Sequence, residues 1–270
     1  MRPSAIRASR LLASAAALAV LALSAAGCKT TGSDTTGSIG ATNTARSDGD
    51  WRQSVDAQGA RYREDPGNAE AAIKYAQVLR ATEQRAQAVA VLEQASIRNP
   101  RNMALLGAYG RALAEAGEYS QALDVLSRAH TPDNPDWHIL NAQGAVLDQL
   151  GRHAEAQRYY SSALKIAPNE PSVLSNLGLS YALTKDLKRA ETTLRRALAQ
   201  PNADPKVKQN LALVVGLQGK FAEAENIARA DLPENEAAAN VNYLRQMLSQ
   251  QGALKKLGRQ PNTPASNAGT

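Results

Sequence analysis

Three histidines are the side chains in this sequence best suited to binding a metal or transferring a proton. They are His130, His138 and His153. None lies beside a cysteine, aspartate or glutamate at ligand spacing, and metal or acid–base chemistry needs several converging groups. The sequence also lacks a glycine-rich phosphate loop and a Gly-x-Ser-x-Gly elbow. We therefore predict no metal site, no cofactor, no small-molecule substrate and no enzymatic activity, with structural or solvated roles for the histidines.

The start of the chain predicts a secretory signal peptide over residues 1–27. Arg2, Arg7 and Arg10 come first, and an unbroken run of apolar and small residues follows from residue 11 to residue 26. This run is shorter than the ~20 residues of a permanent membrane span. The predicted signal peptide contains these three arginines and no acidic residue, so its removal lowers the formal net charge from +6 to +3. So small a charge does not predict a nucleic-acid partner.

The single cysteine, Cys28, predicts covalent lipid attachment. The small residues Ala25, Ala26 and Gly27 precede it, and this segment resembles the bacterial lipobox, although that pattern more often has leucine in place of Ala25. The resemblance implies that Cys28 becomes the lipid-modified first residue of the mature protein. A lone cysteine has no partner for an intramolecular disulfide. The alternative is an ordinary signal peptide followed by a free thiol.

Residues 28–48 are rich in threonine, glycine, serine, alanine and asparagine. Such a segment cannot bury enough apolar surface to fold. We expect a flexible tether with a root-mean-square reach of ~25 Å. Lys29 follows the cysteine, at a place where aspartate would favour inner-membrane retention in enteric bacteria. We therefore expect the protein at the outer membrane, facing the periplasm.

The rest of the chain repeats itself every 34 residues. Alanines recur at this spacing, with mostly large apolar residues four positions later and glycine or alanine twelve positions earlier. The three sets are Ala88, Ala122, Ala156, Ala190 and Ala224; Leu92, Leu126, Tyr160, Leu194 and Ala228; and Ala76, Gly110, Gly144, Gly178 and Ala212. Small residues let paired helices approach closely, while the larger ones fill the seam. Gly117, Gly151 and Gly219 mark the turns between the helices.

A period of this length is typical of the tetratricopeptide repeat, a helix-turn-helix unit. The sequence therefore predicts an all-α fold, a tetratricopeptide-repeat right-handed superhelix (α-solenoid) over residues 49–250. About five repeats are expected, each of one helix pair; they cover residues 69–102, 103–136, 137–170, 171–204 and 205–234. A half-repeat over 50–65 and a helix with Ala237, Val241, Leu244 and Leu248 on one face should cap the ends. Residues 251–270 are expected to be disordered.

By resemblance to other tetratricopeptide superhelices, the first helix of each repeat lines a concave groove. The second repeat places Arg111 there, whereas the last three repeats place asparagine and leucine. These groove candidates are Asn141, Asn176, Leu179, Leu183, Asn210, Leu213 and Leu217. Asparagine can offer a donor and an acceptor to a peptide backbone while leucines take its side chains. The alternative is that these residues only pack between helices.

The lipobox, the tether, the repeats and the closing segment from Glu236 to Arg245 together resemble the TadD lipoproteins of tight-adherence (Flp) pilus systems. Residues 127–137 and 209–219 also look like that family rather than a generic repeat. The resemblance implies protein partners and a role in assembling the pilus secretion machine, by helping its secretin ring localise or multimerise.

Two other functions stay open at this point. One is a repeat lipoprotein that serves outer-membrane protein insertion or peptidoglycan enzymes. The other is an enzyme built on a repeat scaffold, which the missing catalytic constellations argue against.

Overall fold

The computed structural model describes residues 48–257, and its regular secondary structure there is helical. The helices are α2 (Asp48–Glu64), α3 (Ala69–Ala81), α4 (Arg85–Arg98), α5 (Met103–Ala116), α6 (Tyr119–Ser127), α7 (Trp137–Gln149), α8 (His153–Ile166), α9 (Pro171–Leu183), α10 (Leu187–Leu198), α11 (Pro205–Leu217), α12 (Phe221–Ala228) and α13 (Glu234–Leu257). The all-α prediction is confirmed. The predicted signal peptide, Cys28 and nearly all of the tether lie outside the described residues, as does the tail from residue 258.

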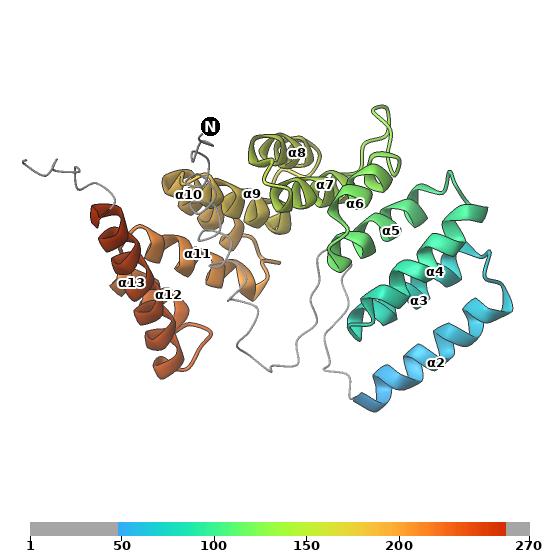
Figure 1. The fold of residues 1–270 in the computed structure, drawn as a ribbon, viewed down its shortest axis with the longest axis horizontal. Coiled ribbons are helices and arrows are strands. Elements are labelled where there is room, and N and C mark those ends of the chain that lie inside the picture. The colour runs from blue at the N-terminus through green and yellow to red at the C-terminus, as the bar shows by residue number, and fades with distance from the viewer. Residues whose placement is uncertain (1–47, 258–270) are drawn as a thin grey trace, which may run out of the picture.

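The helices follow one another along an arch, with α2 at one end and α13 at the other (Figure 1). Each of the five expected repeats contains one helix pair, α3–α4 to α11–α12. Each first helix packs against its own second helix and against the first helix of the next repeat. The backbones of successive second helices, such as α8 and α10, do not contact one another. The first helices therefore form the inner side of the arch, and the second helices spread apart on its outer side.

Small residues at the repeat spacing make the seams between paired helices. The recurring alanines Ala88, Ala122, Ala156, Ala190 and Ala224 are all 0% exposed. A Cβ added to Gly110 would lie 2.5 Å from Leu126 Cγ, and one added to Gly178 would lie 2.7 Å from Leu194 Cγ. These contacts are shorter than two carbon atoms tolerate, so only glycine allows the helices this spacing.

The turn within each repeat contains a residue in the left-handed region. Gly117, Gly151 and Gly219 have φ values of 87°, 74° and 83°. The two equivalent positions without glycine, Glu83 and Lys185, have φ values of 60° and 65°. The repeat geometry therefore imposes a conformation on these two residues that side chains with a Cβ disfavour.

Capping helices close both ends of the stack. At the first end, Tyr62 of α2 lies 5.7 Å from Tyr75 of α3, ring centroid to ring centroid, and its hydroxyl donates to Gln94 Oε1 at 2.8 Å. At the other end, Ala237, Val241 and Leu244 of α13 are buried.

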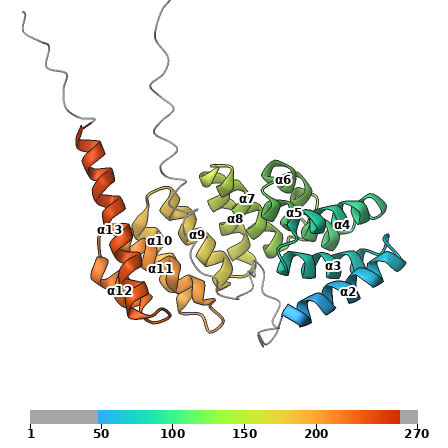
Figure 2. The ribbon, with the colours of Figure 1, turned by 60° about the horizontal axis from the view of Figure 1, so that its bottom comes forward.

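Helix α13 extends beyond α12 to Leu257 (Figure 2). Our expectation of disorder from residue 251 was therefore wrong for residues 251–257, where the helix simply continues. None of the described helices combines the length and the apolarity of a membrane span.

Candidate functional site

The predicted groove leucines lie on the inner surface of the arch, on α9 and α11. Leu179, Leu183, Leu213 and Leu217 are all half-buried. In the described part of the chain, none of them belongs to the buried core clusters or packs against those clusters. Within each helix the two leucines are four residues apart, so they lie on the same face of that helix. These leucines therefore form an apolar surface directed away from the core.

The predicted groove asparagines form a ladder between the first helices. Asn176 Nδ2 donates to Asn141 Oδ1 at 3.0 Å, which joins α9 to α7. Asn210 Nδ2 donates to Ser175 Oγ at 3.0 Å, which joins α11 to α9. Each amide has two N–H donors and a carbonyl oxygen with two acceptor sites, so these bonds use only part of its capacity. The three asparagines therefore support the stack and keep further hydrogen-bonding capacity on the inner side.

The inner surface of the first two repeats is charged instead of apolar. Arg80 of α3 forms a bidentate ion pair with Glu115 of α5, in which Nε donates to Oε2 at 2.6 Å. Burial lowers the pKa of Arg111, the neighbouring charge of Arg80 lowers it further, and Asp136 and Glu115 oppose both effects. The predicted site residue Arg111 thus lies in an ionic cluster, separate from the leucines of α9 and α11.

Two histidines do lie beside carboxylates, contrary to our reading of the sequence. His138 Nδ1 is 2.9 Å from Asp136 Oδ1, and His153 Nδ1 is 2.8 Å from Asp148 Oδ1. Burial raises the pKa of Asp136, but hydrogen bonds from His138 outweigh it and leave the pKa below its usual value. Each pair has only two members, and the described residues contain no group of three or more ligands able to hold a metal.

Asp148 also organises a buried polar network that we did not predict. Ser180 Oγ donates to Asp148 Oδ1 at 2.9 Å, and Tyr160 Oη donates to Asp148 Oδ2 at 3.0 Å. Burial, together with the charge of Asp148, raises the pKa of Tyr160 well above its usual value. The network joins α7, α8 and α9, and it satisfies polar groups that would otherwise be costly to bury. Its role is therefore structural.

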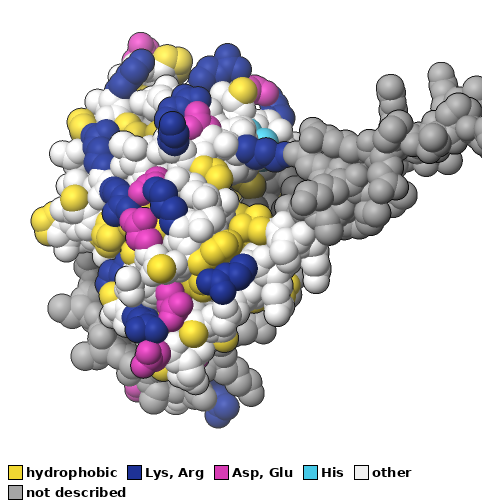
Figure 3. Space-filling model, turned by 90° about the vertical axis from the view of Figure 1, so that its left-hand side faces the viewer, with side chains coloured by type: hydrophobic (Ala, Val, Ile, Leu, Met, Phe, Trp, Pro, Cys, Tyr) yellow, Lys and Arg dark blue, Asp and Glu magenta, His cyan; other side chains and the backbone are white. Residues whose placement is uncertain are grey.

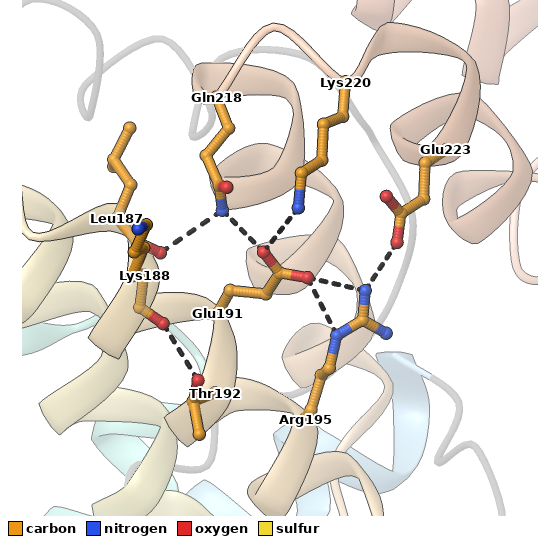
Figure 4. Close-up of polar contacts among 8 residues, drawn as sticks. All are labelled: Leu187, Lys188, Glu191, Thr192, Arg195, Gln218, Lys220 and Glu223. Carbon is orange, nitrogen blue, oxygen red and sulfur yellow. Dashed lines mark hydrogen bonds and ion pairs between the residues drawn. The ribbon is translucent and has the colours of Figure 1, made fainter.

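On the outer side, charged residues tie α10 to the last repeat (Figure 4). Glu191 accepts from Lys220 Nζ at 2.9 Å, from Gln218 Nε2 at 2.7 Å and from Arg195 Nη2 at 2.7 Å. The hydrogen bond from Lys220, with those from Arg195 and Gln218, lowers the pKa of Glu191 to about 2 against the opposing effect of burial. Figure 3 shows charges of both signs interspersed on the surface at this end of the molecule.

Comparison with known proteins agrees with this architecture. The tetratricopeptide-repeat family pattern matches residues 79–144 and 149–214. A search of curated protein sequences finds no match.

Several solved structures are similar to this chain. PilW, described as a widely conserved type IV pilus biogenesis factor, has 18% identity and a TM-score of 0.64, over 72% of this chain and 91% of that one. The pilF protein of Pseudomonas aeruginosa has 18% identity and a TM-score of 0.53, over 74% and 85% of the two chains. The Cut9–Hcn1 part of the APC/C has 16% identity and a TM-score of 0.59, over 74% and 41%. At these identities the likeness concerns the fold.

The helix pairs, their 34-residue spacing and the matched pattern lead to one conclusion. Tetratricopeptide domains bind peptides and proteins and are typically not enzymes. This chain therefore has the fold of a tetratricopeptide-repeat solenoid, the kind of fold that serves as a scaffold for protein interactions.

Proposed function

We propose that this protein holds an extended segment of a partner protein along the inner surface of α7, α9 and α11. One observation supports the proposal above all: the four leucines of α9 and α11 lie off the core, beside asparagines with hydrogen-bonding capacity to spare. An accessible apolar surface with nearby hydrogen-bonding groups suits an extended peptide that has few charges.

The spacing of the helices defines the peptide that fits. Neighbouring packed helices lie about 8–10 Å apart, and an extended chain advances about 3.3 Å per residue. Leu179 and Leu213 occupy equivalent places on neighbouring first helices. We therefore expect bound side chains about three residues apart, with the peptide backbone hydrogen-bonded to the asparagine ladder.

For the cellular role, we propose an outer-membrane lipoprotein, anchored through Cys28 and facing the periplasm, that assists a tight-adherence (Flp) pilus secretion machine through its secretin. The support comes from the TadD-like segments of the sequence and from the fold shared with PilW, a pilus biogenesis factor. The alternative partners are proteins of outer-membrane insertion or peptidoglycan enzymes.

Site-specific photo-cross-linking in the bacterium tests this proposal. A cross-linking amino acid at Leu213 should capture one major partner, and the secretin is the expected product. The matched control is Ile97 of α4, which is 75% exposed and lies outside the inner surface. Capture of an outer-membrane insertion protein or a peptidoglycan enzyme would contradict the pilus role and support that alternative. The same cross-linked products at Leu213 and at Ile97 would refute the inner groove as the binding site.

A double variant tests the asparagine ladder itself. Asn176→Ala with Asn210→Ala should weaken partner capture about tenfold, because each lost hydrogen bond contributes about 0.5–1.5 kcal/mol. Unchanged capture by a folded double variant would show that these residues only pack between helices.

A further inference from the structure

A second groove lies on the outer side of the arch, between α8 and α10. It is open to solvent along one side and has a volume of about 400 Å³. Its floor is apolar and comes from Leu164, Leu174, Leu177 and Tyr181, while α10 supplies one wall. Such a volume falls within the range of ligand pockets, about 300–1,000 Å³.

The curvature of the solenoid explains why this groove exists. The first helix α9 contacts both α7 and α11, whereas the second helices α8 and α10 do not contact each other. Side chains of α9 that would be covered in a straight stack therefore form the floor between two separated second helices. The corresponding gap between α10 and α12 is bridged by the ion pair of Arg195 with Glu223 at 2.5 Å, and Glu191 of α10 also pairs with Lys220 in the turn just before α12 (Figure 4). No ion pair joins α8 to α10 in the described residues.

The wall of the groove is basic. Lys188, Arg189 and Arg196 line it together with two threonines, and none of the nine lining residues is acidic. Arg189 is paired with Asp186 outside the groove at 2.5 Å and lies 4.6 Å above the ring of Tyr181. Arg196 donates to the carbonyl oxygen of Pro168 and to Asn169 Oδ1, which are both neutral. The positive charge along α10 is therefore only partly compensated.

From this combination we infer that the outer groove binds an acidic, amphipathic segment of a partner protein, in addition to the peptide proposed for the inner surface. Apolar side chains of that segment enter between Leu177 and Leu164, and its carboxylates meet Lys188 and Arg196. Charge complementarity of this kind supplies the direction and specificity of docking. The inference does not depend on the inner groove, because it uses different helices and different residues.

The recessed floor favours a peptide over an anionic membrane. Leu174 and Leu177 are buried below the exposed side chains of Lys188 and Arg196. A flat lipid surface would meet the basic side chains first and would leave the apolar floor uncovered. The side chains of a helical or extended peptide, in contrast, reach into the groove.

Fluorescence anisotropy with the full chain in detergent tests the inference. The probe is a labelled peptide of about 14 residues with leucine at i, i+3, i+4 and i+7 and glutamate at the flanking positions. It should bind, and the same peptide with lysine in place of glutamate should not. Lys188→Glu with Arg196→Glu should weaken binding about tenfold or more. Thr192→Trp, which fills the groove and keeps its charge, should also abolish binding.

Two controls separate the groove from general charge effects. Arg101→Glu with Arg158→Glu changes the net charge equally at exposed residues outside the groove and should leave affinity within about twofold. Leu213→Arg on the inner surface should also leave it unchanged. Absence of binding, equal binding of the lysine peptide, equal loss in both double variants, or displacement of the peptide by phosphatidylglycerol vesicles would each overturn the inference. Failure of cross-linking at Leu213 would count against the inner groove alone.

Discussion

Replacing Lys185 with glycine should stabilise the protein, although the substitution removes a side chain. Lys185 has a φ of 65° in the turn between α9 and α10, where Gly117, Gly151 and Gly219 occupy the equivalent turns. A residue with a Cβ in this conformation loses about 1–2 kcal/mol relative to glycine. Glycine in turn makes the unfolded chain more flexible, which opposes folding by about 0.5–1 kcal/mol. The net gain in the free energy of unfolding should be about 0.5–1 kcal/mol.

Urea unfolding followed by circular dichroism and by tryptophan fluorescence measures this gain. Trp137 begins α7, one repeat before the substitution, and so reports on the neighbouring part of the stack. For a domain of about 200 residues, the expected rise in melting temperature is about 1–4 °C. The Glu83→Gly substitution should act in the same direction and add to the first, because the two turns are far apart and share no contacts.

The control is Lys185→Ala, which removes the same side chain but keeps the strained conformation and should give no gain. Glycine in the exposed interior of a helix, as in Ala90→Gly in the middle of α4, should instead cost about 1 kcal/mol. If Lys185→Gly lowers stability as much as Ala90→Gly does, then residue 185 carries no strain and the reasoning from the turn geometry is wrong.

Three further predictions concern the seam between paired helices, the hydrogen bonds of Glu191 and the predicted lipid anchor. Ala156→Leu should cost about 1–3 kcal/mol of unfolding free energy, because this alanine is 0% exposed between paired helices; Ala86→Leu, at an exposed place, should cost little. Since the pKa of Glu191 is lowered to about 2 in the folded protein, its stabilising contribution is complete above about pH 4.5 and is lost as the pH falls towards 2. Acid titrations of stability should therefore be shallower for Glu191→Gln, and identical curves would contradict the pKa. Finally, Cys28→Ala should move the protein from the membrane to the soluble fraction on cell fractionation, and continued sedimentation with membranes would exclude lipidation as the anchor.

The features that recur every 34 residues were the ones that the sequence could predict. The seam between the paired helices is built from small and large residues at the same positions of each repeat, so the 34-residue spacing of these residues is visible in the sequence alone. Gly144 and Tyr160 show the rule, since a Cβ on this glycine would lie 2.5 Å from the tyrosine ring. The strained turns at Glu83 and Lys185 could have been predicted in the same way. Their position in the 34-residue repeat predicts the left-handed conformation, although glutamate and lysine rarely adopt it.

The contacts of single repeats could not be predicted, because they depend on how helices far apart in sequence are placed. Asp148 bonds to Tyr160, 12 residues away, and to Ser180, 32 residues away. Nothing in the spacing of these three residues identifies them as neighbours. The outer groove depends on the curvature of the whole stack, and no residue spacing in the sequence predicts that curvature.

Backbone contacts join each helix only to the next helix or the next but one. The loops that must close during folding are therefore short, and their entropic cost stays the same however many units the chain contains. Gain or loss of one 34-residue unit by recombination would change the length of the inner surface in a single step while rebuilding only one interface. A protein built in this way can alter the reach of its binding surfaces without redesigning its interior.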